Sequence, residues 1–193
     1  MTVLTFEAPR FSCSLACGQC DFVKANGTRC RNRVCFGTPT CWIHTMIQYG
    51  VKTRLSTIPN AGKGLFATRD FRFREYICPY VGEELPEDCI TLRYGEGTAP
   101  YATSSGDDSI DSACQRGIAS LANGLFTPGG RSRDKRFHNA ELYHNEGDND
   151  RPWLKALRGI RSGQEIFVYY GRDYVLGNDH TTRRRRTVDN RPC

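Results

Sequence analysis

Apolar side chains recur from about residue 52 onward in short stretches that are separated by turn-forming residues. Stretches of this kind are typical of β-strands. The clearest are 64–67, 76–81, 153–157 and 165–170, with long polar stretches at 101–108 and 128–138 between them. The best helix candidate, 111–121, is short, and we find no long amphipathic helix and no internal repeat. The pattern therefore predicts an irregular, mostly β domain.

Residues 13–46 have a different composition, being small, polar and rich in Cys, Gly and Arg. Such a segment cannot bury a hydrophobic core and needs another source of stability. Six of the ten cysteines and one of the four histidines fall within its 32 residues from Cys13 to His44: Cys13, Cys17, Cys20, Cys30, Cys35, Cys41 and His44. The other cysteines are scattered: Cys78, Cys89, Cys114 and Cys193. This asymmetry indicates metal binding rather than packing.

Zinc prefers four tetrahedral ligands, and thiolate and imidazole suit it best. Cys41 and His44 have the spacing of one ligand pair. Cys20 and Cys30 flank the turn-forming Asn26-Gly27, so they can converge as the second pair. The segment therefore predicts a small zinc-stabilised module.

The stretch from residue 20 to 44 also resembles a short Cys3His module found in viral and protist proteins. That resemblance implies the ligand set Cys20, Cys30, Cys41 and His44. Cys17 and Cys20 have ligand-pair spacing as well, so a rival ligand set or a second metal stays open.

Length and composition limit the class of protein. At 193 residues the chain is long enough for one domain and a small appendage, and with 38% hydrophobic and 25% charged residues it should form a core. No apolar run reaches the roughly 18 residues that suggest a membrane span. The first residues lack the pattern of a secretory signal. We therefore expect a protein of the nucleus or cytoplasm (of a host cell, if the sequence is viral), with reduced cysteines and no membrane contact.

The net charge of +6 is concentrated in two places. One is a C-terminal run, 183–186, with Arg191, in an expected basic tail at 177–193. The other cluster consists of Arg131, Arg133, Lys135 and Arg136. Such runs are usually solvated, but they can also contact phosphates, bind a partner that is already on nucleic acid, or act as a nuclear address. The sequence does not choose between these alternatives, so nucleic-acid or nucleosome contact is kept as one of them.

Three motifs follow one another in the later part of the chain. The first, 58–67, contains Gly62 and Gly64, where the backbone can approach a ligand without a Cβ in the way. The second comprises 116–124 and, after a basic insertion, 138–142. The third, 154–171, ends in Tyr169-Tyr170-Gly171. In this order they resemble the SET-domain family of protein-lysine methyltransferases over residues 52–176.

The resemblance implies a fold of small sheets, β-clip-like, with a knot-like C-terminal segment. It also implies roles for particular residues. Those beside S-adenosylmethionine would be Gly62, Lys63, Gly64, Leu65, Asn123, Gly124 and Tyr170. The catalytic tyrosine would be Tyr170, with Tyr80 and Tyr174 lining the channel for the target lysine.

Three departures from the family pattern stand out. The family's His-Ser pair is replaced by Gly124-Leu125, Val168 stands where the family has Phe or Tyr, and no Cys-x-Cys cluster follows Gly171. Because of Val168, the number of methyl groups added cannot be read from the sequence. Without the Cys cluster something else must close the channel, for which we consider residues 178–180 or a dimer partner.

A narrow aromatic channel suits lysine methylation, since the reacting amine must be neutral and free lysine has a pKa near 10.4. Desolvation disfavours the ammonium form. The leading hypothesis is therefore a lysine methyltransferase acting on histone tails, where the choice of histones is an analogy with the family. The alternatives are an inactive SET-fold adaptor that binds chromatin or nucleic acid, and a methyltransferase of a non-histone protein.

Overall fold

The computed structural model describes residues 17–35, 39–95, 99–114, 117–144, 151–172 and 174, with the backbone alone at residue 35. The predicted tail at 177–193 lies outside the described residues, as do Cys13, Arg116 and the channel-closing candidate 178–180.

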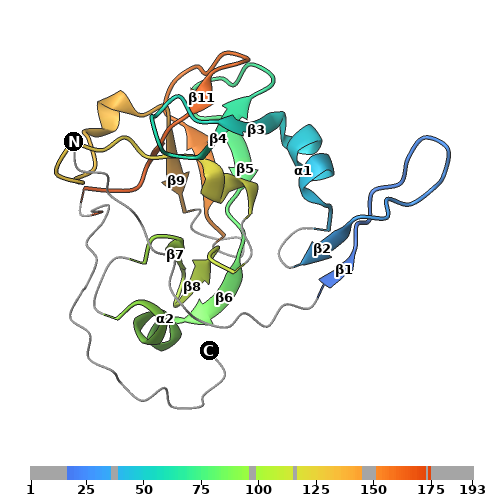
Figure 1. Ribbon diagram of the computed structural model, residues 1–193, viewed down its shortest axis with the longest axis horizontal. Helices are drawn as coiled ribbons and strands as arrows, with labels where there is room; N and C mark the ends of the chain where they lie inside the picture. The colour runs from blue at the N-terminus through green and yellow to red at the C-terminus, as the bar shows by residue number, and fades with distance from the viewer. Residues whose placement is uncertain are drawn as a thin grey trace.

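A two-stranded hairpin and a helix form the N-terminal part. Strand β1 (Cys17–Gln19) pairs antiparallel with β2 (Arg33–Cys35), and the hairpin projects from one side of the molecule (Figure 1). Helix α1 (Trp42–Tyr49) connects it to the body. The helix ends at Gly50, which adopts the left-handed conformation (φ 66°) and donates its N–H to Ile47 O. A side chain at Gly50 would also meet Arg69 at 2.7 Å, so glycine is required there twice over.

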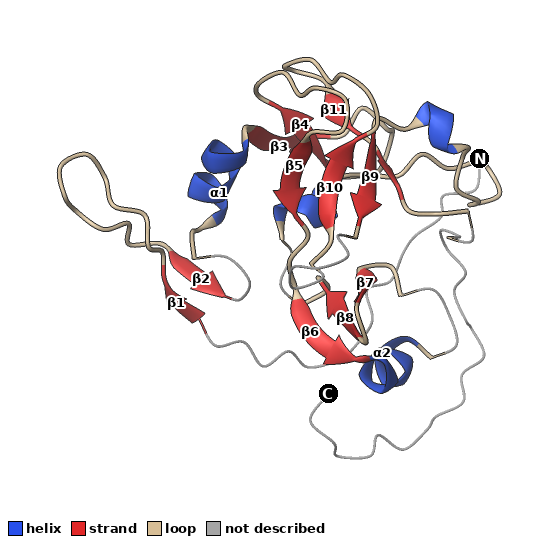
Figure 2. Cartoon of the chain, turned by 180° about the vertical axis from the view of Figure 1, so that it is seen from behind, coloured by secondary structure: helices blue, strands red, loops and turns tan. Residues whose placement is uncertain are grey.

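Three small β-sheets make up the body (Figure 2). The first has the order β11-β4-β3, with β3 Val51–Leu55, β4 Lys63–Ala67 and β11 Glu165–Ile166. The second has the order β12-β9-β10-β5, with β5 Tyr76–Pro79, β9 Ala140–Tyr143, β10 Trp153–Ala156 and β12 Val168–Tyr169. The third has the order β6-β8-β7, with β6 Glu83–Pro86, β7 Ala102–Ser105 and β8 Asp108–Asp111. The remaining helices are α2 (Glu87–Tyr94) and the 3-10 turns η1 (Ile118–Leu121) and η2 (Lys135–Phe137).

The main hydrophobic core lies between the first two sheets and η1. Its largest fully buried apolar side chains are Val51, Leu65, Phe71, Ile77, Ile110 of the third sheet, Leu154, Ile160, Ile166 and Val168. Met46 and Tyr49 of α1 pack against it, whereas Cys20, Cys30 and Cys41 form a separate cluster. Helix α1 thus bridges the hairpin and the body, with Cys41 at its start and core contacts towards its end.

The C-terminal strands are inserted between two earlier segments. Val168 donates its N–H to Asn123 O (2.9 Å), and β12 pairs in parallel with β9. Asn139 fixes the same segment through its side chain, donating to Glu165 O (2.8 Å) and accepting from Phe167 N (2.7 Å). This interleaving corresponds to the knot-like arrangement implied by the family resemblance.

The four expected strand regions are confirmed as β4, β5, β10 and β11–β12. The helix expected at 111–121 is wrong: Asp111 ends β8, and in the described part of this stretch only Ile118–Leu121 is helical, as a 3-10 turn. The carboxylate of Asp111 is buried and accepts hydrogen bonds from Arg93 and Tyr94, which fixes the end of β8 to α2. The polar stretch at 101–108 also contains a strand, β7.

The expectation that all cysteines are reduced is also wrong. Cys17, Cys89 and Cys114 are disulfide-bonded, whereas Cys20, Cys30, Cys41 and Cys78 carry free thiols. The expectation rested on cellular compartment alone, and spacing along the chain does not reveal which thiols the fold brings together.

Candidate active site and metal centre

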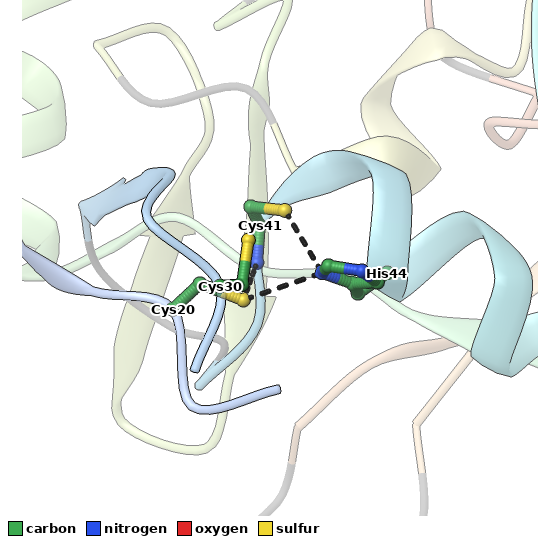
Figure 3. Close-up of side chains that lie close together, drawn as sticks. All are labelled: Cys20, Cys30, Cys41 and His44. Carbon is green, nitrogen blue, oxygen red and sulfur yellow. Dashed lines mark hydrogen bonds between the residues drawn. The ribbon is translucent and has the colours of Figure 1, made fainter. Parts of the chain in front are cut away.

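Four potential ligands converge where the hairpin meets α1. Cys20 and Cys30 come from the two arms of the hairpin, Cys41 caps α1 and His44 lies in its first turn (Figure 3). Their ligand atoms all lie within 4.8 Å of one another. His44 Nδ1 is 3.5 Å from Cys20 Sγ and 3.3 Å from Cys41 Sγ. Tetrahedral zinc holds sulfur and nitrogen ligands about 3.5 Å apart, so the group fits this ion.

Neighbouring groups orient these side chains. The backbone N–H of Cys41 donates to Cys20 Sγ (3.1 Å), and the Asn32 side chain donates to Cys41 Sγ (3.3 Å). Phe22 stacks on the His44 ring, with centroids 3.7 Å apart. Burial alone would raise the pKa of Cys41, but hydrogen bonds from Asn32 and His44 outweigh it and lower that pKa to about 6. The thiolate of Cys41 is therefore favoured at neutral pH, whereas at Cys30 a hydrogen bond from the Asn32 backbone is outweighed by burial and by the neighbouring Cys20 and Cys41, which raise the pKa of Cys30.

These are the four ligands predicted from the sequence, and the structure brings them together. The rival set that used Cys17 is not supported, because Cys17 is disulfide-bonded. A cluster of four Cys and His side chains is the chemistry of a structural zinc site, with no open position for a substrate.

The second site begins at the turn into β4. Gly62 has φ 71°, and a side chain at Gly64 would meet Glu165 Oε1 at 2.2 Å and Asn123 Nδ2 at 3.3 Å. Asn123 in turn donates to Lys63 O (3.1 Å). The structure thus brings the predicted cofactor residues of the first motif beside Asn123, 60 positions later in the chain. The side chain of Leu65 is fully buried in the main core, so Leu65 could face a cofactor only through its backbone.

Glu165 is the centre of this arrangement, although the sequence analysis did not single it out. Its carboxylate is buried and accepts hydrogen bonds from Ser56 Oγ (2.6 Å) and from both the N–H and hydroxyl of Thr57 (2.7 and 2.5 Å). One carboxylate therefore ties the loop before β4 to β11. The signal in the sequence was an acidic residue at the start of the otherwise apolar and aromatic stretch 165–170.

The predicted tyrosines gather in one aromatic cluster. The rings of Tyr170 and Tyr174 stack with centroids 5.0 Å apart, and Phe126 lies 5.7 Å from Tyr174. Tyr170 donates its hydroxyl to Ala122 O (2.6 Å), and Tyr80 donates to Tyr101 O (2.8 Å). Tyr80 interacts electrostatically with Tyr170 and Tyr174, and Tyr80 belongs to the main core cluster, against which Tyr170 packs.

Two residues complete this cluster. A side chain at Gly124 would meet Phe126 at 2.8 Å and Tyr170 at 2.9 Å, so Gly124 makes room for both rings. Tyr101 influences Tyr80, Tyr170 and Tyr174 electrostatically and was missed, since it lies in no motif.

The hydroxyls of the cluster are neutral at physiological pH. Burial raises the pKa of Tyr170 and of Tyr80 well above the ordinary value, and raises that of Tyr174 to about 12. These groups can therefore donate or accept hydrogen bonds, but a tyrosinate base is not available here. A cationic amine entering the cluster would lose hydration, which favours its neutral form.

His138 supports the segment that contains Gly124 and Leu125; it lies in the second motif, and the sequence analysis assigned it no role. It is fully buried, with Nε2 accepting from Leu125 N (3.0 Å) and Nδ1 placed to donate to Asp134 O (3.2 Å). This pattern requires the neutral ring, and burial lowers the pKa of His138 accordingly. His138 thus fixes Gly124-Leu125, the pair that replaces the family's His-Ser.

A family model described as SET domain matches residues 62–171, more than half of the chain. The chain belongs to the SET-domain family. No curated protein matches it closely enough to be counted as a relative.

Solved structures show the same fold. A chain of the Chaetomium thermophilum polycomb repressive complex 2 (PRC2) is similar to this SET-domain protein, with a TM-score of 0.51 and 21% identity over 64% of this chain and 15% of that chain. A ctPRC2 chain in an autoinhibited conformation bound to S-adenosylmethionine also gives 0.51 and 21%, over 65% and 15%. The SET-domain protein thus spans about 15% of the length of these chains. Among the described residues, no helix is long and apolar enough to cross a membrane.

Proposed function

We propose that this SET-domain protein is an S-adenosylmethionine-dependent protein-lysine N-methyltransferase. The observation that carries the proposal is the cluster of Tyr80, which is buried, with the partly buried Tyr170 and Tyr174, beside the segment that contains Asn123 and Gly124. An adaptor that only bound chromatin would not need such a cluster of neutral, desolvated hydroxyls.

The cofactor would lie against Gly62, Lys63 and Gly64 on one side and against Asn123 on the other. Two of these are already linked, since Asn123 donates to Lys63 O. When bound, S-adenosylmethionine would supply a sulfonium methyl carbon that is open to in-line attack by a neutral amine, with the thioether sulfur as the leaving group. The sulfonium charge adds to the desolvation that favours a neutral target amine.

The role of the protein is then mainly alignment and exclusion of water. The aromatic rings bound a narrow path for the aliphatic part of the lysine. The neutral hydroxyl of Tyr170 can accept a hydrogen bond from the amine and direct its lone pair towards the methyl group. The proton of the lysine ammonium leaves to solvent before transfer, because no tyrosinate is available as a base.

We infer that the substrate is a protein, with a histone tail as the first candidate and a non-histone protein as the second. The same proposal places the protein in the nucleus or cytoplasm. The Cys3His group would hold one zinc ion in a structural role, since it lies in the hairpin module rather than among the tyrosines.

Replacing Tyr170 by Phe removes one hydroxyl with little change in volume. We expect turnover to fall by about 10²-fold or more, because a positioned hydroxyl is lost from the reacting centre. The measurement is methyl transfer from labelled cofactor to histone mixtures and to a whole-cell protein extract. Folding is checked in parallel, since Ala122 O also loses its hydrogen-bond donor.

The matched control is Tyr169→Phe. Tyr169 is on the other face of the strand, where its ring lies 5.4 Å from His138, so activity should change little. If the wild-type protein labels nothing in either mixture, or Tyr170→Phe is as active as wild type, the adaptor function gains and the catalytic assignment fails.

A further inference from the structure

A surface that we call the basic edge lies beside the tyrosine cluster. It consists of five exposed basic side chains and one exposed aromatic ring: Arg131, Arg133, Lys135, Arg136, Arg158 and Phe137. The fold adds Arg158 to the four clustered in the sequence, because its Nη2 donates to Arg136 O (2.7 Å). Two acidic groups lie among them, Asp134 as the cap of η2 and Glu141 paired with Lys135. The surface therefore keeps an excess of positive charge.

The basic edge is fixed to the wall of the lysine channel. Arg133 donates its backbone N–H to Leu125 O (2.8 Å), and Ser132 donates to Tyr174 O (3.3 Å). Between these contacts, Phe126 forms a bridge with Ser132 and packs its ring against Tyr174. Among the described residues this loop covers Tyr174, which gives the basic insertion a position at the channel rather than on a remote face.

The β1–β2 hairpin, which carries Cys20 and Cys30, is not part of this surface. Figures 1 and 2 place the η2 turn and the β1–β2 hairpin at opposite ends of the long axis. A ligand of the basic edge is therefore recognised by the SET domain itself.

The chemistry of the basic edge favours phosphates. Guanidinium groups match phosphate oxygens in geometry and charge. The guanidinium groups of Arg133 and Arg136 lie 4.3 and 5.1 Å from the centroid of the Phe137 ring. With these cations on it, the ring is poorly placed to stack on an unpaired base, which is how single-stranded nucleic acid is usually held. A surface that contacts the phosphate backbone of a nucleic acid, and offers no ring for its bases to stack on, suits duplex DNA.

We propose that the basic edge binds the phosphate backbone of duplex DNA and thereby presents the lysine channel to a protein that is already bound to DNA. The second half of this statement rests on the proposed methyltransferase function. The DNA contact does not, so the two can fail separately.

The test uses the full-length protein and a labelled DNA duplex, with affinity measured by fluorescence anisotropy at several salt concentrations and without cofactor. The variant is Arg133→Ala/Arg136→Ala. Loss of two phosphate contacts should reduce the slope of log affinity against log salt by about 1.8, since each contact contributes about 0.9. Affinity at moderate salt should fall by about tenfold or more, as expected for two lost charge-assisted contacts.

The matched control is Lys52→Ala/Arg54→Ala on β3, which also removes two exposed positive charges. Arg54 likewise lies over an aromatic ring, 5.2 Å from the centroid of Phe66. This variant should keep the wild-type salt slope. An unchanged slope and affinity in Arg133→Ala/Arg136→Ala would overturn the proposal. So would more effective competition by single-stranded RNA, or by polyglutamate as an acidic protein surface.

Methylation then separates the two proposals. Arg133→Ala/Arg136→Ala should lower methyl transfer to nucleosomes while leaving transfer to free histones near the wild-type level. Equal loss on both substrates would contradict a role in presenting DNA-bound protein. Wild-type protein that binds duplex DNA through the basic edge but methylates nothing would contradict the enzyme and leave the DNA contact standing.

Discussion

The absence of a side chain at Gly64 matters both for the proposed cofactor site and for the packing of the fold. The family resemblance singles it out for a close approach of the cofactor to the backbone. In the structure, a side chain at Gly64 would collide with the buried carboxylate of Glu165 before it reached any ligand. A bulky substitution at Gly64 would therefore test folding as much as cofactor binding, and Glu165 is the more informative position.

Glu165→Gln should lower the free energy of unfolding by about 1–3 kcal/mol. The side chain keeps its shape, but one carboxylate oxygen becomes an amide that faces the donors of Ser56 or Thr57. Urea unfolding measures the change. Glu84→Gln is the control, since the Glu84–Arg151 ion pair is exposed on both sides and its loss should cost less than about 1 kcal/mol. Equal effects of the two substitutions would show that Glu165 does not tie the loop to β11.

The lowered pKa of His138 predicts that the stability of the fold depends on pH. Burial lowers its pKa below the ordinary value near 6.5, so the unfolded chain binds the proton more readily than the folded protein. The stability that the neutral ring contributes is present above about pH 6.5 and is lost as the pH falls towards the lowered pKa of the folded state. Thermal unfolding of wild type should therefore shift downward on acidification from pH 7.

His138→Gln should flatten this dependence, although its stability at pH 7 will be lower because two buried hydrogen bonds change. His144→Gln, at an exposed position, should keep the wild-type slope. Since acid can also loosen the metal site, only the difference between the two variants is diagnostic. Identical slopes would exclude His138 as the titrating group.

Among the elements, the apolar core strands were predictable, whereas polar strands such as β7 and the helices were not. Short apolar runs bounded by turns correspond to β4, β5 and β10, because burial on a pleated sheet imposes that pattern directly. Helix α2 buries only Cys89 and Ile90, so its sequence carries almost no helical periodicity. Helix α1 was hidden because its first turn was assigned to the metal site. In both helices tertiary contacts select the structure, and the local pattern does not show them.

The metal site makes a prediction about the hairpin. Purified protein should contain one zinc ion, and a chelator should raise amide hydrogen exchange in residues 17–35 and in the first turn of α1. Exchange in β3, β4 and β5 should change little, because the core cluster includes none of the cysteine ligands.

Cys30→Ser should lose the zinc, whereas Cys78→Ala should retain it, since Cys78 is buried in the main core away from the Cys3His group. Protein without zinc after purification in the absence of chelator would contradict the assignment.

At the scale of the whole molecule, the sequence motifs predicted only those residues of the candidate site at which the family pattern has a characteristic residue type. Tyr80, Tyr170 and Tyr174 were predicted, and the structure gathers them in one cluster. Tyr101 and Glu165 were not, since each acts by lying opposite a residue far away in the chain. The same is true of Arg158, whose place in the basic edge depends on a contact with Arg136 O. Long-range proximity of this kind needs the fold.

The interleaved C-terminus predicts that the SET domain folds as one unit with its last strands. Removal of residues 163–193 deletes β11 and β12, which leaves the Asn139 side chain without its two backbone partners and uncovers the edges of β4 and β9. It also removes Ile166 and Val168 from the core, at about 1.5–3 kcal/mol for each fully buried side chain. Since a domain of this size is stable by only about 5–15 kcal/mol, the shortened chain should show no cooperative transition in urea. Of the residues that the structure describes, removal of residues 1–38 deletes the hairpin, whose buried cysteines lie outside the main core, so a cooperative transition should remain. The opposite pattern, with the hairpin essential and the last strands dispensable, would mean that the main core is organised by the metal module.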